Sequence, residues 1–347
     1  MVINFKKKNS KKDTEKESEL NIKVKKGKID QVKEFKYLGE SFNESGDNKT
    51  KIQKRLNKIP YMIQTIKRYG STEKVGKLSM QVRLKLLKAV VMPTILYGTE
   101  IFTNLTREEC QEIQKLHQSL LVGTFGVEES TPYWGMISES GIWPIHQMIH
   151  YKKLVAYHWF ITSNDSRLAK QLLLNQANSV LPNCWYTEIE TIAKEYGIDI
   201  RIETTSNKIK SKWKKEVKEK IHKRIEEIVR DETANKTKLR LIKYDKYERK
   251  EYLNTCSIKD VTKIMRYRLN MTKIKANYKG KYNDLTCDAC KEEQETTEHI
   301  TNCKEYRRMF KWTKETQETN KNSTTELLSI AQYAEEIEQY KQRFGLW

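Results

Sequence analysis

The sequence lacks a long apolar run and a secretion signal. None of its runs approaches the roughly 20 apolar residues that cross a bilayer, so we expect no transmembrane segment and no membrane partner. The first residues, Met1 to Lys6, also lack the apolar stretch and small-residue cleavage site of a secretory signal. We therefore expect an intracellular protein of the nucleus or cytoplasm.

Several enzyme signatures are missing as well. The sequence has neither a Gly-rich phosphate loop nor a Gly-x-Ser-x-Gly elbow, and His146 and His150 lack the Glu that a His-Glu-x-x-His metalloprotease needs. We interpret these two histidines, and His158 near the same helical face, as core residues among Trp143, Tyr151 and Trp159. No catalytic residue is predicted.

Positive charge is abundant. The 347 residues contain 66 Lys and Arg against 46 Asp and Glu, a formal net charge of +20. Such an excess attracts polyanions, and without a membrane segment the favoured partner is RNA, DNA or both. Lysine and arginine side chains serve both nucleic acids, so the sequence leaves the preference open.

The chain predicts a mainly α fold with a short β-hairpin or meander at its start. Apolar and polar residues alternate in segments 2–5, 21–24 and 35–39, with Gly27 between the last two, and this pattern is typical of short strands. A lone hairpin is marginally stable in water, so these strands should form the edge of a larger body.

Helical periodicity begins at Lys49. We expect a helix over 49–66 that Pro60 divides, a second over about 78–97 that Pro93 interrupts, and a third opened by the capping box of Thr106 and Glu109. A loop is expected at 123–132. Further helices are predicted at 145–162, 166–176, 184–196 and 208–230, and another after the capping signal at Ser323.

The helix predicted at 208–230 has only a narrow apolar stripe. Trp213, Val217, Ile221 and Ile225 can be buried on one edge, and nearly every other position is Lys, Arg or Glu. Its charged faces must remain exposed. The region 208–250 is therefore expected to contribute strongly to nucleic-acid binding, with Lys214, Lys215 and Lys218 as candidate contacts.

One cluster carries specific metal chemistry. Cys287, Cys290, His299 and Cys303 follow the spacing C-x2-C-x8-H-x3-C. A C-x2-C turn presents two thiolates to one ion, and a His and a Cys four residues apart share a helical face. Because four N/S ligands complete a tetrahedron, we predict a structural Zn²⁺ site. The alternative is a chance cluster of core residues.

Four segments in order resemble the C-terminal half of a reverse transcriptase from non-LTR (LINE-type) retrotransposons. Residues 35–39 (Phe-Lys-Tyr-Leu-Gly) resemble the hairpin that grips the primer, and residues 91–100 resemble the P-x-x-x-Y-G-x-E segment of the thumb. Residues 126–144 resemble the linker, and the Cys287–Cys303 cluster resembles the family's zinc knuckle. The resemblance implies that Tyr37 contacts a primer and that Lys51, Lys54, Arg55 and Lys58 lie along a template–primer duplex.

The resemblance also implies the domain organisation. Residues 1–45 would be a remnant of the polymerase palm and primer grip, 46–125 a helical thumb, 126–255 a helical linker that is strongly basic at 208–250, 256–310 the zinc-knuckle region and 311–347 a C-terminal helix.

One departure from the family matters for function. The polymerase needs two metal-binding aspartates in a Tyr/Phe-x-Asp-Asp turn, and the chain contains no Asp-Asp dipeptide. The leading hypothesis is therefore a nucleic-acid-binding fragment without catalytic aspartates. Two alternatives remain open: an accessory part of an active reverse transcriptase whose palm comes from a longer or partner chain, and a recruited scaffold protein.

Overall fold

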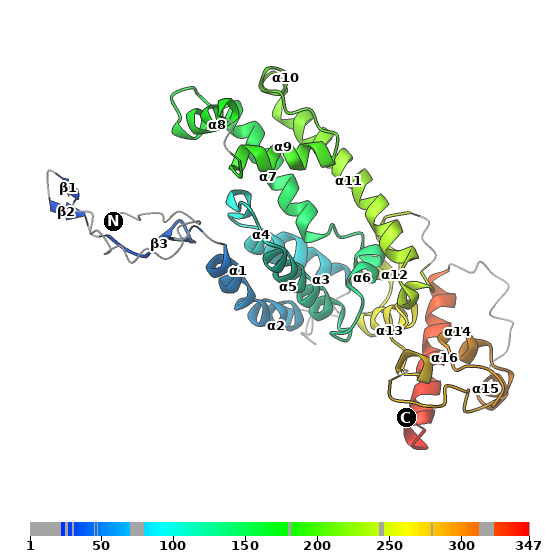
Figure 1. Cartoon of the computed structure of the whole chain (residues 1–347). Coiled ribbons are helices and arrows are strands. Elements are labelled where there is room, and N and C mark those ends of the chain that lie inside the picture. The colour runs from blue at the N-terminus through cyan, green and yellow to red at the C-terminus, as the bar shows by residue number, and fades with distance from the viewer. Residues whose placement is uncertain are drawn as a thin grey trace.

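A computed structural model describes residues 22–24, 27–29, 31–44, 46, 48–69, 80–179, 182–242, 246–278, 280–311 and 323–346. Within them the chain is mostly helical, with two antiparallel hairpins at its start (Figure 1). This confirms the predicted fold class. The strand predicted at 2–5 lies outside the described residues.

The two hairpins are separate two-stranded sheets. Strand β1 (Ile22–Val24) pairs with β2 (Gly27–Ile29), and β3 (Glu34–Tyr37) pairs with β4 (Glu40–Asn43) with Phe35 opposite Phe42. Leu38 and Gly39 form the turn of the second hairpin, both with positive φ (48° and 89°), which matches the mirror-image turns that two-residue hairpin loops favour.

Both predicted proline interruptions are present. Helices α1 (Lys49–Leu56) and α2 (Ile59–Tyr69) are separate, and Pro60 occupies the second position of α2. After α3 (Met80–Leu86) the helix widens into the π-helical turn η2 (Leu87–Val91) and continues as α4 (Met92–Ile95). Pro93 has no N–H to donate, so a widened turn beside it is expected. The 3₁₀ turn η3 (Thr99–Ile101) follows.

Helix α5 (Arg107–Phe125) begins at the predicted capping box. The Thr106 hydroxyl accepts the Glu109 N–H at 3.2 Å, and the Glu109 carboxylate accepts the Thr106 N–H at 2.9 Å. The loop predicted from Gly123 is wrong at its start, because the helix continues to Phe125. Gly123 lies inside α5 and allows the helix to pack closely against Ile63 of α2, because a Cβ at this position would lie only 2.6 Å from the Ile63 side chain.

The central body packs α5 and α11 against α7 (Figure 1). Helix α7 (Ile145–Ile161) and α11 (Lys210–Ala234) confirm the predictions for 145–162 and 208–230, and the α11 stripe is buried as expected, with Trp213 fully enclosed. Helices α8 (Leu168–Asn178) and α9 (Trp185–Glu195) begin one or two residues after their predicted starts. The sequence reasoning missed α6 (Tyr133–Ser140) and α10 (Ile202–Ser206).

A buried ion pair connects the middle of the chain to its C-terminal part. Glu139 of α6 is fully buried and accepts two hydrogen bonds from Arg268 of α13 (Ile258–Arg268), at 2.8 and 2.9 Å. The hydroxyl of Tyr252, in α12 (Tyr252–Thr255), donates to the same carboxylate at 2.8 Å. Both carboxylate oxygens of Glu139 therefore accept hydrogen bonds, and loss of Arg268 would leave an uncompensated buried charge.

The C-terminal part has a second, smaller core. Helix α16 (Thr324–Arg343), red in Figure 1, packs against α13 and against α14 (Thr297–Asn302), with α15 (Lys304–Met309) beyond. The predicted cap is present, because the Ser323 hydroxyl accepts the Glu326 N–H at 3.2 Å. The remaining elements are the 3₁₀ turns η4 (Thr237–Leu239) and η5 (Lys275–Tyr278). Among the described helices, none is long and apolar enough to span a membrane.

Candidate metal centre and basic pocket

The four predicted metal ligands converge. Cys287 and Cys290 lie in the turn that follows Thr286, whose backbone pairs with that of Gln294. His299 belongs to α14, and Cys303 ends that helix. One ligand atom from each of the four residues lies within 4.8 Å of all the others. The structure therefore brings together the complete set that the sequence predicted, and these residues can bind a metal ion.

The distances fit a tetrahedral ion. The sulfurs of Cys287 and Cys303 are 4.0 Å apart, and Cys290 Sγ lies 3.4 Å from His299 Nε2. A tetrahedral Zn²⁺ with bonds of about 2.3 Å to sulfur and about 2.0 Å to nitrogen would separate such atoms by about 3.8 and 3.5 Å. These two separations are therefore close to those that a tetrahedral ion would impose.

Neighbouring groups prepare the ligands for a cation. Glu293 Oε2 lies 3.0 Å from His299 Nδ1, which directs the other ring nitrogen, Nε2, toward the cluster. Burial raises the pKa of the Cys287 thiol well above its ordinary value, because an isolated thiolate is unfavourable in an apolar setting. A cation among the ligands would remove that penalty.

A buried ionic network attaches the cluster to the C-terminal helix. The ammonium of Lys341, on α16, is fully buried and contacts both Glu295 and Asp288, the latter at 3.0 Å. Lys275 reaches the other oxygen of Asp288 at 2.7 Å. Asp288 lies between the two cysteines of the C-x2-C turn, so α16 and the cluster are joined through charges that are paired in the folded state.

The hollow beside the metal cluster is acidic. Its volume is about 760 Å³. Its charged lining consists of one lysine and four glutamates: Lys304, Glu292, Glu293, Glu298 and Glu305. One of the glutamates, Glu298, is held by Arg240 through hydrogen bonds of 2.5 and 2.7 Å. This surface disfavours a phosphate.

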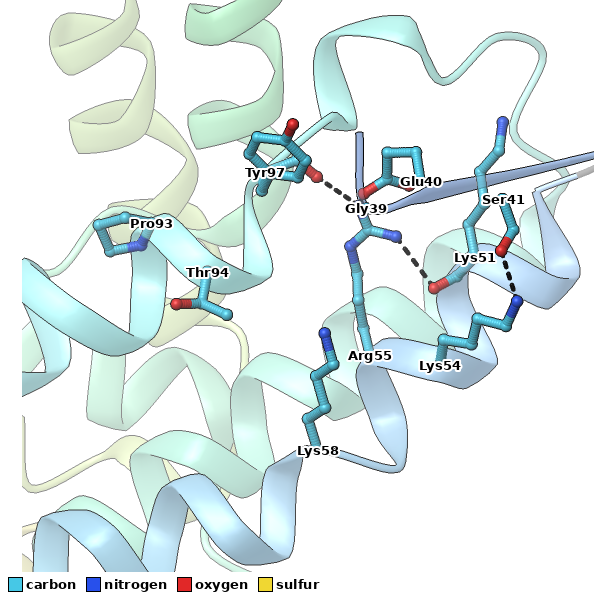
Figure 2. A pocket seen from close by; sticks show the side chains of 10 residues that line it. All are labelled: Gly39, Glu40, Ser41, Lys51, Lys54, Arg55, Lys58, Pro93, Thr94 and Tyr97. Atoms are coloured by element: carbon cyan, nitrogen blue, oxygen red, sulfur yellow. Dashed lines mark hydrogen bonds and ion pairs between the residues drawn. The ribbon is translucent and has the colours of Figure 1, made fainter. Parts of the chain in front are cut away.

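A second cavity, of about 380 Å³, is basic (Figure 2). It lies between the β3–β4 hairpin, α1 and the segment around α4, so residues almost sixty positions apart share its wall. We call it the basic pocket. Its lining residues are Gly39, Glu40, Ser41, Lys51, Lys54, Arg55, Lys58, Pro93, Thr94 and Tyr97.

Arg55 fixes the geometry of the basic pocket. Its guanidinium donates to the carbonyl of Ile95 and to the carboxylate of Glu40, each at 2.9 Å. It also donates to the carbonyl of Tyr97 (Figure 2). Burial lowers the pKa of Arg55, and the charge of Glu40 opposes that effect. The side chain thus holds the hairpin and α4 against α1.

The tyrosine and glycine of the 91–100 segment complete this junction. The Tyr97 hydroxyl donates to the carbonyl of Leu38 at 2.7 Å. Gly98 has a φ of +68°, and a Cβ there would lie 2.7 Å from the side chain of Glu40. Only glycine satisfies both conditions without strain.

The predicted contacts of α1 are not equally exposed. Lys51 is buried, with its ammonium 5.0 Å from the centre of the Phe42 ring, and Arg55 is buried as described. Lys54 is half exposed and pairs with Glu34 at 2.5 Å, whereas Lys58 is exposed and extends toward the space below Thr94 (Figure 2). Only Lys54 and Lys58 of this set can meet a ligand directly.

The other predicted contacts lie outside the basic pocket. Tyr37 is 57% exposed near the hairpin turn. On α11, Lys215 and Lys218 are exposed and Lys214 is half-buried. Thr94 and Tyr97 line the basic pocket but were not predicted as site residues. The 91–100 motif was the available signal for them, and only the fold places it opposite α1.

The histidines of α7 are packed as core residues. His150 Nδ1 lies 2.7 Å from the Tyr196 hydroxyl, and burial lowers the pKa of His150 to about 3. His158 stacks on Trp213 with ring centroids 5.6 Å apart. The expected neighbour Trp159 is 44% exposed and is not part of the core, because it lies on the outer side of α7. Among the described residues, the only metal-ligand cluster is that of Cys287 to Cys303.

Comparisons of the chain with family models, with curated proteins and with solved structures give no match.

Proposed function

We propose that the chain is a nucleic-acid-binding fragment of the non-LTR reverse transcriptase type, without polymerase catalysis of its own. The observation that carries this proposal is the basic pocket. The hairpin segment 35–39 and the thumb-like segment 91–100, the two N-terminal stretches of the resemblance, meet there around α1. Nucleic acid as the ligand implies a site of action in the nucleus or cytoplasm.

The electrostatics support a polyanionic ligand. Arg55 is neutralised by Glu40, and the half-exposed Lys54 pairs with Glu34 at 2.5 Å. Exposed Lys58 also lines the basic pocket and has no ion pair within the described part of the chain. The net charge of +20 adds a long-range attraction for phosphates. Tyr97, 49% exposed, lines the basic pocket with these cations, and aromatic rings beside positive charge suit unpaired bases as well as backbones.

The metal centre has a structural part in this proposal. We assign Zn²⁺ to it, because three thiolates and one imidazole at these distances suit that ion best. All four tetrahedral positions would be filled by Cys287, Cys290, His299 and Cys303, which leaves none for a substrate. The ion would hold the C-x2-C turn to α14 and, through Asp288, support α16.

Binding measurements test the proposal. The chain should bind RNA and DNA tightly at low salt, with weak sequence dependence and a steep loss of affinity as salt rises. Reversing three α11 charges together (Lys214→Glu, Lys215→Glu and Lys218→Glu) should weaken binding and reduce the slope of log affinity against log salt. Absence of binding to both nucleic acids at low ionic strength would refute the proposal.

The absence of catalysis is tested separately. Two-metal phosphoryl transfer needs carboxylates that hold both ions. The aspartates of residues 1–45 are Asp13 and Asp30, which lie outside the described residues, and no acidic residue directly precedes or follows either of them. Primer extension with Mg²⁺ or Mn²⁺ should show no incorporation by this chain alone. Incorporation that disappears on mutation of Asp13 or Asp30 would show that the chain is a polymerase.

A further inference from the structure

The two ends of the basic pocket offer different chemistry (Figure 2). At one end are the ring of Tyr97, the turn residue Gly39 and the carboxylate of Glu40. Gly39 lies directly against the ring, since a Cβ on it would be 3.7 Å from a ring carbon of Tyr97. At the other end Lys58 extends toward the space below Thr94. An aromatic ring beside a hydrogen-bond acceptor suits a base, and an ammonium group suits a phosphate.

The cations of the basic pocket are not equally available. Arg55 and Lys54 pair with carboxylates. Lys51 is buried, with its ammonium 5.0 Å from the centre of the Phe42 ring. Lys58 is exposed, and within the described part of the chain its ammonium forms no hydrogen bond or ion pair. Among the described residues that line the cavity, one cation is therefore free for one phosphate.

The ring of Tyr97 is held in place by two hydrogen bonds. Its hydroxyl donates to the carbonyl of Leu38 at 2.7 Å, and its own carbonyl accepts a hydrogen bond from the guanidinium of Arg55. The side chain is nevertheless half-exposed. A ring that is already fixed loses little freedom when a ligand binds, which favours affinity. Such a ring is suited to stacking against a base.

The size of the basic pocket limits what can enter it. Its volume of about 380 Å³ is near the lower end of the range for small-molecule pockets, roughly 300–1,000 Å³. It can hold one nucleotide but not a double helix. In a duplex the faces of each base are covered by stacked neighbours, and only the base edges are accessible in the grooves. A base can therefore contact the Tyr97 ring only when it is unpaired.

We propose that the basic pocket holds one unpaired nucleotide of a single-stranded RNA or DNA, with its base against Tyr97 and its phosphate at Lys58. This rests on the proposed function and deepens it, because it names single strands as the preferred class of nucleic acid. It also makes Tyr97 the residue that distinguishes a single strand from a duplex.

A comparison of single strand and duplex is the first test, because charge alone predicts the opposite preference. A duplex carries about one negative charge per 1.7 Å of its axis, twice the density of one strand, so a purely cationic surface binds it more tightly. Fluorescence anisotropy with a 20-nucleotide strand and with its duplex, at one salt concentration, should show tighter binding of the single strand. Tighter binding of the duplex would overturn the inference while leaving the proposed function intact. Absence of binding to either would overturn both.

Two substitutions at Tyr97 isolate the contribution of the ring. Tyr97→Phe and Tyr97→Leu both lose the hydrogen bond to Leu38, but only Tyr97→Phe keeps an aromatic face. Tyr97→Leu should weaken single-strand binding by about tenfold, and Tyr97→Phe by about twofold at most. Duplex affinity should be unchanged in both variants, which also reports that the hairpin and α1 remain folded. Equal losses in the two variants, or equal losses for single strand and duplex, would overturn the role of the ring.

The phosphate contact is tested with Lys58→Gln. This variant should reduce the slope of log affinity against log salt by about 0.7 for the single strand, the value for one phosphate. The matched control is Lys115→Gln, which removes the same charge from an exposed position on α5 outside the cavity and should leave the slope unchanged. Equal changes in slope would overturn the contact.

Adenosine monophosphate is the probe for a free nucleotide. It should bind far more weakly than the 20-nucleotide strand, because a strand makes further phosphate contacts outside the basic pocket. If it bound as tightly as the strand and Tyr97→Leu abolished that binding, the occupant would be a free nucleotide, and the assignment to a single strand would be overturned.

Discussion

The basic pocket and the hollow at the metal cluster differ in charge and in how their charges are anchored. In the basic pocket, Glu40 pairs with the buried Arg55, and the half-exposed Lys54, which pairs with Glu34, and the exposed Lys58 line the cavity. At the metal cluster, Lys275 forms an ion pair with Asp288, and Lys341 forms one with Glu295. Glutamates line the hollow beside the cluster. In each region the less abundant kind of charge is held in ion pairs, and the more abundant kind lines the cavity.

The difference bears on how a zinc knuckle is interpreted. A knuckle in a chain of net charge +20 invites the assumption that it contacts nucleic acid. Its open side carries Glu292, Glu293 and Glu305, which would repel a phosphate backbone. We therefore expect the metal centre to stabilise the C-terminal part, and the basic pocket and α11 to bind the ligand.

Removal of a metal ligand should have the largest effect. Cys290→Ser should release the metal and loosen α14, α15 and α16, because the binding free energy of a structural Zn²⁺ is about 10–16 kcal/mol in small domains. The helices of the central body have their own core and should persist. Elemental analysis and circular dichroism would measure both effects. Cys184→Ser, at a cysteine outside the cluster, is the matched control.

Cys290→Ser also tests whether the metal region takes part in binding nucleic acid. If the metal region serves structure only, nucleic-acid affinity should stay within about twofold of the parent value, since no phosphate contact is lost. A large loss of affinity with an intact central body would show that the knuckle belongs to the interface.

A paired charge experiment should have an intermediate effect. Lys54→Gln with Lys58→Gln removes two cations from the basic pocket and should weaken binding by on the order of tenfold at low salt. Glu292→Gln with Glu305→Gln changes the net charge by the same amount at the acidic hollow and should leave affinity unchanged or slightly higher. Fluorescence anisotropy on one labelled oligonucleotide would compare them. Changes of similar size and opposite sign would mean that only total charge matters.

The metal cluster could be predicted because its determinants are local. All four ligands fall within seventeen residues, and a C-x2-C turn and a His and Cys four apart set most of the geometry through backbone conformation alone. The long helices were predictable for a similar reason, since their period and caps are written in neighbouring residues. The reciprocal bonds at Thr106 and Glu109 are an example.

The basic pocket could not be derived from the sequence, because it depends on tertiary contacts. A helical lysine is exposed by default, and nothing near Lys51 indicates that Phe42 and Phe102 will cover it. Arg55 contacts a strand on one side and the carbonyls of Ile95 and Tyr97 on the other. Gly123 was assigned to a loop for the same kind of reason: its use as a packing site depends on Ile63, sixty positions earlier.

The smallest expected effect is a loss of folding stability at low pH, through a histidine in α5, the helix that packs against α1 and α2. His117 of α5 is fully buried, its Nδ1 lies 2.9 Å from the Tyr133 hydroxyl, and α5 packs against α1 and α2. Burial, and then the charge of His146, lower the pKa of His117 to about 3. In the unfolded chain the value is about 6.5, so the unfolded state takes up the proton first. The stability that neutral His117 provides is complete above pH 6.5 and declines as the pH falls toward 3.

Between pH 7 and 5.5 this single group should lower the free energy of unfolding by about 1 kcal/mol. Lysine ammonium groups and backbone phosphates keep their charges over this range, so any weakening of nucleic-acid binding would come from the scaffold and not from the contacts. Urea unfolding followed by circular dichroism at the two pH values, on the parent chain and on His117→Gln, would measure the difference. The variant should be less stable at pH 7 because its side chain fits Tyr133 less well, yet its stability should fall less on acidification. If the two proteins lost stability equally between pH 7 and 5.5, His117 would already be protonated or exposed in the folded chain. The packing of α5 beneath the basic pocket would then differ from the structure described above.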